Sequence, residues 1–372
     1  METINILVVE DEDALFNGYV DSAQELSDAS LNIQLARGVT AEEASRVLVE
    51  NEFHGAIIDL NLLGDTNSED PSGVCVISEI LTEYRIPIIV VSGNLQNLPE
   101  KFDPNEHEFL KSYDRDTQNK IIFEDILRIF KTGILKVIGG KGLIEKNLNT
   151  VFWSHLSKDI DAWYDESDDV VERSLLRYTI NHLLAYLDKS DDGSHNSYHE
   201  AEFYLKEPIK NIISPGDIVV NPITNDRYIL LSPACDVEVR QGVEDTINAK
   251  SLMLGKIYDS RPESLVDKGL LKRGHNKSDV RSLIGKVVKG QEAKFIFLPK
   301  YKELGEGIIN FQDLLTINFN EYRTYQRLAT VSVSFFKDIQ SRFASYYGRQ
   351  GMPDLNKTGI IENYIQQHYP TA

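Results

Sequence analysis

Cysteine and long apolar runs are scarce in this chain. Only Cys75 and Cys235 occur among 372 residues, and their wide separation indicates neither a disulfide framework nor a metal cluster. No apolar run approaches the roughly 18 residues needed to span a bilayer. The first five residues, METIN, lack the basic stretch that begins a secretory signal. We therefore expect a cytoplasmic protein.

The acidic charge is concentrated in one part of the chain. Residues 1–130 contain 26 Asp and Glu against 8 Lys and Arg, a balance of −18, whereas the other 242 residues hold 32 acids and 31 bases. The total of 372 residues exceeds the usual size of one hydrophobic core. We expect at least two domains, with a boundary near residue 130.

Residues 1–130 alternate between apolar runs and amphipathic stretches. Continuous apolar runs are typical of strands buried on both faces of a parallel sheet. Thr40 and Glu43 form a T-x-x-E capping box, which predicts the start of a helix. The expected strands are residues 4–9, 32–36, 55–60, 87–91 and 108–110, and the expected helices are residues 13–26, 40–51, 73–84 and 116–130. This pattern predicts an α/β fold with a doubly wound, five-stranded parallel sheet.

Polar side chains follow the predicted strands of this sheet. Glu10 and Asp11 follow the first strand, Asp59 ends the third, Ser92 the fourth and Lys111 the fifth. Because the carboxyl ends of parallel strands share one edge, we expect these side chains to converge. Crowded carboxylates favour a hard divalent cation such as Mg²⁺. A carboxylate beside the metal and an ammonium group is suited to accept a phosphoryl group.

The order and spacing of these residues resemble those of CheY-like receiver domains of two-component response regulators. The resemblance implies that Asp59 is the phosphoryl acceptor and a metal ligand. It also implies that Asp11 binds Mg²⁺ directly, that Glu10 assists, and that Asn61 supplies its backbone carbonyl to the metal. A sensor histidine kinase or a phosphotransfer protein would be the phosphoryl donor.

The same resemblance makes Ser92 the switch hydroxyl and Lys111 the lysine that pairs with the phosphate. The chain departs from the family pattern at Ser112, which replaces a proline after the lysine. Pro99 and Pro104 fall where the fourth helix is expected, and proline disfavours a helix interior. That surface commonly serves output or dimerisation in the family, so a homodimer is less strongly expected here.

Residues beyond the receiver-like region resemble no family that we identify. Residues 131–150 are rich in glycine and predict a linker with a short apolar strand or turn at 134–138. Beyond them we expect an atypical α+β region, comprising helices in residues 151–200, a small barrel-like sheet in 210–320 and a helix in 321–348. No helix-turn-helix pattern stands out.

Three functions compete for this second region. The first is an effector that acts by protein contact. The second is nucleic-acid binding, because residues 250–302 contain 13 bases and 5 acids. The third is an enzyme that uses Cys235, although nothing in the sequence places a histidine beside that thiol. Whether the whole chain is an enzyme stays open, since the receiver would catalyse only its own phosphorylation.

Overall fold

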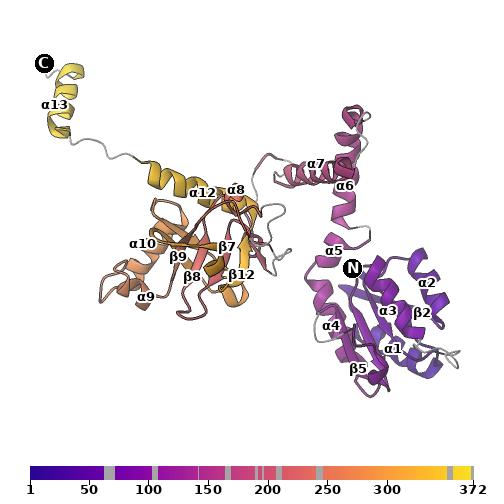
Figure 1. Ribbon diagram of the computed structural model, residues 1–372. Helices are drawn as coiled ribbons and strands as arrows, with labels where there is room; N and C mark the ends of the chain where they lie inside the picture. Colours follow the sequence, from indigo (N-terminus) through magenta and orange to yellow (C-terminus); the bar gives the residue numbers. More distant parts are fainter. Residues whose placement is uncertain are drawn as a thin grey trace. The chain divides into compact units, whose positions relative to one another are not determined.

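The computed structural model divides into two compact units, Met1–Asn196 and Ser197–Ala372, which are described separately (Figure 1). The structure describes residues 1–62, 72–102, 108–140, 142–163, 169–188, 192–194, 197–206, 212–239, 246–349 and 355–369. Within these ranges, no helix combines the length and the apolar character needed to cross a membrane.

The first unit contains a five-stranded parallel sheet with the strand order β2-β1-β3-β4-β5. Its strands are β1 (Glu2–Val9), β2 (Leu31–Gly38), β3 (Gly55–Ile58), β4 (Ile88–Ser92) and β5 (Leu110–Asp114). The sheet confirms the predicted doubly wound α/β fold. The strand order reverses between β1 and β3, so their carboxyl ends form the topological switch point where ligands bind in such folds.

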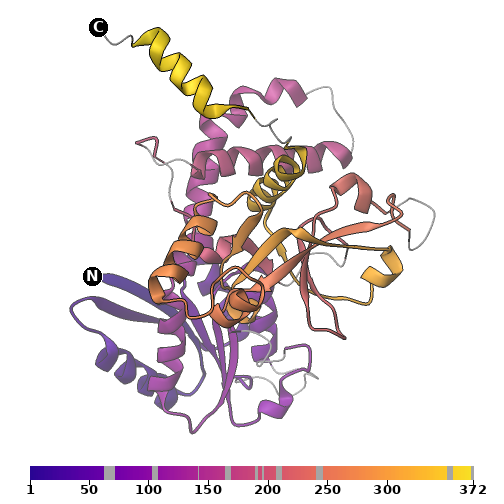
Figure 2. The same ribbon diagram turned by 90° about the vertical axis from the view of Figure 1, so that its left-hand side faces the viewer.

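Two helices cover each face of this sheet. They are α1 (Asp13–Leu26), α2 (Ala41–Glu50), α3 (Ser72–Glu83) and α4 (Asn119–Lys131). One buried cluster joins the sheet to α2 and α3, and a second joins it to α1 and α4. Thr40 caps α2 by accepting the backbone N–H of Glu43 at 3.2 Å, as the capping box predicts. Figure 2 shows the helices on both sides of the strands.

The connection between β4 and β5 carries no regular helix in its described residues. These residues form only the 3₁₀ turn η1 (Leu95–Asn97), in agreement with the expectation from Pro99. Pro104 lies outside the described residues. In the described part of this connection, a 3₁₀ turn stands where family members commonly carry a fourth helix.

The fifth strand differs from its predicted position. We expected residues 108–110 with Lys111 at the carboxyl end, whereas β5 spans Leu110–Asp114. Leu110 packs into the core on the α2–α3 side, and Tyr113 packs against the core beside α1 and α4. The alternation of these two side chains continues the strand beyond Lys111, which consequently lies inside β5.

The glycine-rich segment after α4 is helical rather than extended. It contains α5 (Ile134–Ile138) where a short strand or turn was expected, and then α6 (Leu143–Ser154). The 3₁₀ turns η2 (Leu156–Lys158) and η3 (Ile160–Trp163) lead toward α7 (Asp169–Leu187), which lies in the stretch 151–200 where helices were expected. These helices belong to the first unit.

The second unit contains a curled seven-stranded antiparallel sheet with the strand order β10-β11-β9-β8-β7-β12-β6 (Figure 2). Its strands are β6 (Tyr204–Lys206), β7 (Asp217–Val220), β8 (Arg227–Leu230), β9 (Leu252–Asp259), β10 (Phe295–Leu298), β11 (Gly307–Ile317) and β12 (Gln326–Val331). Its helices and 3₁₀ turns are η4 (Glu200–Phe203), α8 (Ala234–Val237), α9 (Pro262–Asp267), α10 (Lys277–Val288), η5 (Lys302–Leu304), α11 (Phe319–Tyr322), α12 (Val333–Gly348) and α13 (Lys357–His368). This arrangement confirms the predicted α+β class with a barrel-like sheet.

The prediction of one long helix at residues 321–348 is wrong for the residues before Val333. Gln326–Val331 forms strand β12, which inserts between β6 and β7, and α12 begins only at Val333. The β-branched pair Thr330 and Val331 suits a pleated strand. Pairing on both sides of β12 outweighs the helical spacing of its apolar residues.

Candidate phosphoryl-acceptor site

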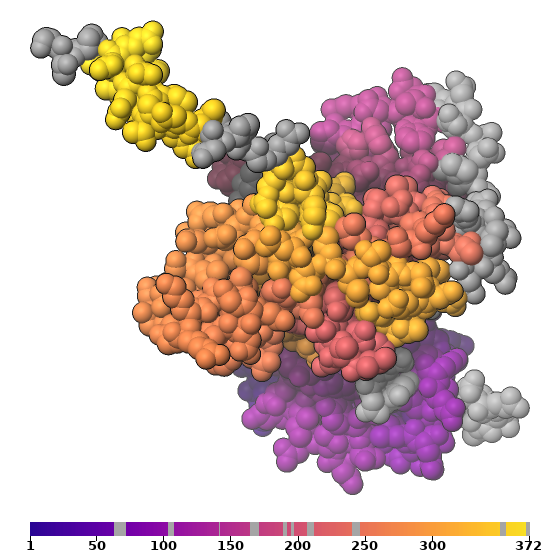
Figure 3. Space-filling model, turned by 60° about the vertical axis from the view of Figure 1, so that its left-hand side comes forward, coloured from indigo at the N-terminus to yellow at the C-terminus, as the bar shows by residue number. Residues whose placement is uncertain are grey.

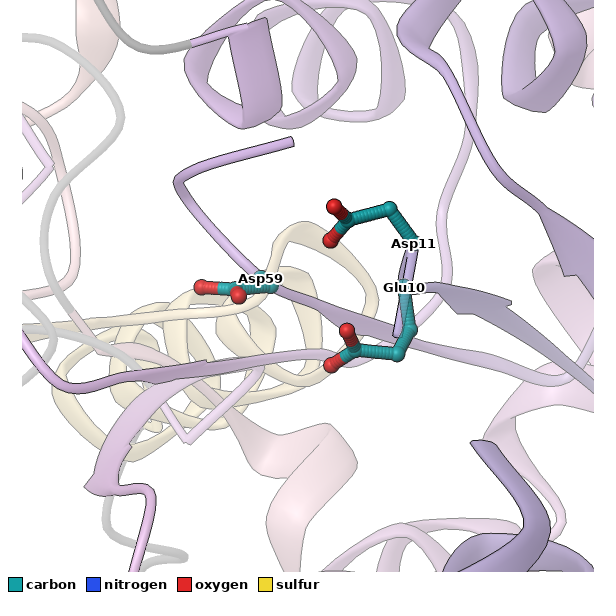
Figure 4. Close-up of side chains that lie close together, drawn as sticks. All are labelled: Glu10, Asp11 and Asp59. Atoms are coloured by element: carbon teal, nitrogen blue, oxygen red, sulfur yellow. The ribbon is translucent and has the colours of Figure 1, made fainter. Parts of the chain in front are cut away.

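Three carboxylates meet at the carboxyl edge of the parallel sheet. Glu10 and Asp11 follow β1, and Asp59 follows β3. In the parallel register Val9 pairs with Ile58, so the residues that follow these strands are neighbours. One ligand atom from each of the three carboxylates lies within 4.8 Å of the others. Figure 4 shows the three side chains together at the ends of the two strands.

Burial makes this cluster electrostatically costly. Glu10 is 3% exposed and Asp59 is 2% exposed. Burial, followed by the negative charges of Asp59 and Asp11, raises the pKa of Glu10 to about 7, although the backbone N–H of Glu12 and the charge of Arg115 oppose this change. Crowded carboxylates of this kind are stabilised by a cation.

Ser92 and Asn61 lie at the same edge. Ile58 pairs with Val90, so Ser92 is one residue beyond the level of Asp59 on the adjacent strand. Ser92 is fully buried, and its hydroxyl oxygen accepts the backbone N–H of Asn94 at 3.4 Å. The backbone N–H of Asn61 is 3.4 Å from Oδ1 of Asp59. The hydroxyl and the Asn61 backbone are therefore placed beside the carboxylate cluster.

A glycine allows α3 to begin directly against Asp59. The backbone N–H of Gly73 donates to the carbonyl of Leu60 at 3.1 Å. A Cβ atom at Gly73 would lie 2.2 Å from the backbone oxygen of Asp59 and 2.8 Å from Cα of Leu60. Only glycine permits this close approach of helix and strand.

Lys111 is not among the residues that the structure brings together. Its register partner is Ile89, whereas Ser92 is level with Asp114. Lys111 thus precedes the strand end by three residues, or about 10 Å along the chain. Its Nζ lies 2.8 Å from Oδ1 of Asp125 on α4, and the hydroxyl of Tyr113 donates to the other oxygen of Asp125.

Arg115 occupies the position that we expected for the lysine. It follows Asp114 at the end of β5, and its Nη2 forms a short ion pair with Oδ2 of Asp59. Its Nη1 lies 3.1 Å from Oε1 of Glu12. The sequence analysis missed this residue because it placed the end of β5 at Lys111. The apolar side chain of Tyr113, two residues after Lys111, was the available signal that the strand continues.

The chemistry of these residues fits Mg²⁺. The ion prefers carboxylate and carbonyl oxygens and keeps several of its waters, so it needs few protein ligands. Asp11 and Asp59 provide carboxylate oxygens at one edge, and the backbone of Asn61 adjoins Asp59 there. Because burial is the main cause of the raised pKa of Glu10, a bound cation would offset the cost of keeping this cluster charged.

Comparisons with known proteins concern mainly the first unit. No protein-family model and no curated protein matches the sequence. Among solved structures, the chain is similar to a CheY-like receiver domain from Methylobacillus flagellatus, with 20% identity over 34% of this chain and 98% of that chain, and a TM-score of 0.27. A CheY-like receiver domain from Methanospirillum hungatei JF-1 shares 14% identity over 37% of this chain and 100% of that chain, with a TM-score of 0.27. These similarities carry no argument by themselves; it is the five-stranded parallel sheet with helices on both faces that is arranged as in a CheY-like receiver.

A third similar structure is the RcsB response regulator of Salmonella typhimurium. It shares 16% identity over 50% of this chain and 98% of that chain, with a TM-score of 0.27. The receiver assignment itself depends on the parallel sheet, its strand order and the helices on both faces. These features concern the first third of the chain.

The other residues considered in the sequence analysis lie in the second unit. Cys235 is exposed on the short helix α8, and its Sγ lies 3.8 Å from Oδ1 of Asp236. No described histidine forms a hydrogen bond with Cys235. Of the basic residues of 250–302, one lies in β9, three lie in α10 and one in η5, namely Lys256, Lys277, Arg281, Lys286 and Lys302, and the others lie between these elements.

Proposed function

We propose that the chain is a two-component response regulator whose receiver accepts a phosphoryl group on Asp59. The observation that carries this proposal is the convergence of Glu10, Asp11 and Asp59 within 4.8 Å at the switch point of the sheet. A carboxylate in such a cluster is a suitable nucleophile for phosphoryl transfer. The donor would be a sensor histidine kinase or a phosphotransfer protein in the cytoplasm.

Each residue of the site has its own role in this proposal. Asp11, Asp59 and the carbonyl of Asn61 hold Mg²⁺, and Glu10 supports the cluster. When bound, the ion neutralises negative charge on the phosphoryl oxygens. Asp59 attacks the phosphorus atom through a carboxylate oxygen. Ser92, buried at the end of the neighbouring strand, donates a hydrogen bond to a phosphoryl oxygen after the transfer.

Phosphorylation with a small-molecule donor tests the assignment of Asp59. The full chain is incubated with acetyl phosphate and Mg²⁺, and the modified residue is identified by mass spectrometry after borohydride trapping. Labelling at Asp59 that disappears in Asp59→Asn is expected. Asp114→Asn is the matched control, because Asp114 lies at the same sheet edge outside the carboxylate cluster. Unchanged labelling of Asp59→Asn would refute the proposed acceptor.

We further propose that the second unit acts by protein contact. A hollow of about 730 Å³ runs along α10. Its lining includes three apolar side chains and three cations, namely Val280, Ile284, Val288, Lys277, Arg281 and Lys289. None of these cations forms an ion pair with a described residue. Figure 3 shows the surface around α10, in orange, on the outside of the second unit.

The composition of this hollow favours an acidic amphipathic helix as its occupant. Carboxylates of such a helix match Lys277, Arg281 and Lys289, while its apolar side chains cover Val280, Ile284 and Val288. A nucleic-acid backbone matches the cations but offers nothing to an apolar floor. Charge complementarity together with the apolar floor therefore favours protein contact over the nucleic-acid alternative.

Two labelled probes distinguish these alternatives on the full chain. One is a helical peptide with leucine at every third or fourth position and glutamate between, and the other is mixed-sequence DNA, single-stranded or duplex. Peptide binding that weakens about tenfold in Val288→Asp and Arg281→Glu is expected, with Lys250→Glu as the control from the same basic region. DNA binding with a steep salt dependence and no peptide binding would favour the nucleic-acid alternative.

A further inference from the structure

Arg115 holds the acceptor carboxylate before any phosphoryl group arrives. One guanidinium nitrogen pairs with Oδ2 of Asp59, and the other terminal nitrogen lies 3.1 Å from Oε1 of Glu12. An arginine guanidinium stays protonated throughout the ordinary pH range. The guanidinium is therefore a fixed positive charge at the acceptor.

Lys111 forms its ion pairs away from Asp59, on the side of the sheet that α4 covers. Its ammonium group lies 2.8 Å from Oδ1 of Asp125 and 3.8 Å from Oε2 of Glu108. To reach Asp59, Lys111 would have to break the pair with Asp125 and also span the three residues that separate it from the end of β5. Among the described cations, Arg115 is the one whose charge reaches Asp59.

We propose that Arg115, and not Lys111, is the cation that pairs with the phosphoryl group on Asp59. This inference rests on the proposed function of the receiver. Before transfer, the guanidinium neutralises the carboxylate and competes with a divalent cation for Oδ2 of Asp59. After transfer, the same guanidinium binds the phosphoryl oxygens that project from that position.

The chemistry of the transfer suits an arginine in this position. With acetyl phosphate as donor, an oxygen of Asp59 forms a bond to phosphorus while the bond from phosphorus to the acetyl oxygen breaks. The electron pair of that bond leaves with acetate, and no proton or redox change is required. The negative charge beside Arg115 increases, because the charge of a phosphoryl group replaces that of a carboxylate. A planar guanidinium binds phosphoryl oxygens through two parallel N–H donors, which an ammonium group does not do.

The side chain is also accessible enough to follow the reaction. Arg115 is 36% exposed, whereas Asp59 is 1% exposed at its side chain. A half-exposed arginine on the residue after β5 can shift by the small distance from a carboxylate oxygen to a phosphoryl oxygen. Solvent screens its ion pair with the exposed Glu12 more strongly than its ion pair with the buried Asp59.

Two binding measurements on the full chain test this inference without a phosphoryl donor. Calorimetry gives the affinity for Mg²⁺ alone, and fluorescence or calorimetry gives the affinity for beryllofluoride, a phosphoryl mimic, in saturating Mg²⁺. Removal of the competing cation in Arg115→Ala should tighten Mg²⁺ binding, and loss of the pairing cation should weaken beryllofluoride binding about tenfold. Arg115→Lys keeps the positive charge but lacks the two parallel N–H donors of the guanidinium, so an intermediate loss of beryllofluoride affinity is expected.

Lys111→Met provides the decisive comparison, since it keeps the aliphatic stem and removes only the charge. Beryllofluoride binding within about twofold of the wild type is expected for this variant. Unchanged beryllofluoride affinity in Arg115→Ala, or an equal loss in Lys111→Met, would overturn the inference. Failure of the wild-type chain both to bind beryllofluoride and to become labelled on Asp59 would instead refute the proposed function. Thermal melting of each variant verifies that it is folded.

Discussion

The Nζ atom of Lys111 lies 2.8 Å from Oδ1 of Asp125, and this pair ties β5 to α4. The lysine side chain is 24% exposed and the aspartate side chain 15% exposed, so solvent screens the pair only in part. Although partial burial raises it, the hydrogen bonds from Lys111 and Tyr113 hold the pKa of Asp125 below its ordinary value. The pair therefore stabilises the packing of β5 against α4.

A double-mutant cycle measures that stabilisation. Lys111→Met, Asp125→Asn and the double variant should give a coupling free energy of about 1 kcal/mol in urea unfolding. Lys120 and Glu124 form a matched pair on the surface of the same helix, 3.9 Å apart and with side chains 67% and 57% exposed. The same cycle on that pair should give a value near zero. Equal coupling at the two pairs would contradict a packing role for Lys111.

His54 makes the stability of the receiver sensitive to pH. Its Nδ1 accepts the backbone N–H of Asn5 at 3.1 Å, and its ring packs edge-on against Phe130 with centroids 5.3 Å apart. Burial lowers the pKa of His54, against the opposing charge of Glu52. The unfolded chain, with the ordinary value near 6.5, then binds more protons than the folded chain.

The free energy of unfolding should therefore fall as pH decreases below about 6.5, and His54 should have no such effect at higher pH. His54→Asn keeps a hydrogen-bond acceptor but does not titrate, so its stability difference between about pH 7.5 and pH 5.5 should be smaller than that of the wild type. Exposed His155 provides the control, as His155→Asn should keep the wild-type slope. A slope that is the same in all three proteins would show that His54 does not set it.

Much of the first unit could be predicted from sequence because its signals are local. The helix at Asp13–Leu26 matches its predicted limits, and continuous apolar runs identify the buried strands. The end of β5 could not be predicted in the same way. It depends on the packing of Tyr113 against the core. It also depends on the hydrogen bonds that Lys111 and Tyr113 donate to Asp125 on α4.

The sequence likewise predicted only part of the acceptor site. The carboxylates that follow β1 and β3 depend only on locating two strands, and the structure brings them together. Arg115 depends on the register of a third strand, and that register is set by tertiary contacts. In the second unit, β12 was missed because Leu328 and Val331 continue the helical spacing of Phe335 and Ile339. Only its pairing with β6 and β7 distinguishes it.

Asp217 is the main buried polar residue of the second unit. It is fully buried, and it accepts hydrogen bonds from the hydroxyls of Thr330 at 2.6 Å and Tyr322 at 3.1 Å, and from the backbone N–H of Ser214 at 2.9 Å. Arg327 lies 3.3 Å from the same carboxylate. Burial, followed by the charge of Asp217, raises the pKa of Tyr322. The carboxylate joins β7 to β12 and α11.

Asp217→Ala should destabilise the second unit by about 3–5 kcal/mol, since it leaves several buried donors without an acceptor. Tyr322→Phe removes one donor and should cost about 1 kcal/mol. The two tryptophans, Trp153 and Trp163, both lie in the first unit. Urea unfolding followed by circular dichroism should therefore show the loss, while tryptophan fluorescence should be unchanged. A shift of the fluorescence transition with Asp217→Ala would indicate that the two units unfold together.

Gly73 limits how closely α3 can approach the acceptor. In Gly73→Ala the new Cβ would meet the backbone oxygen of Asp59 at 2.2 Å, which is too short for any contact, so α3 or the chain after β3 must move. Because Asp59 itself borders the clash, we expect labelling by acetyl phosphate to fall together with a destabilisation of about 1–3 kcal/mol. Gly18→Ala is the matched control within helix α1, where the Cβ would make only an ordinary contact at 3.5 Å with Asn119. That variant should be as stable as the wild type or up to about 1 kcal/mol more stable, because alanine favours a helix. Normal labelling in Gly73→Ala would mean that α3 can shift without displacing the acceptor carboxylate.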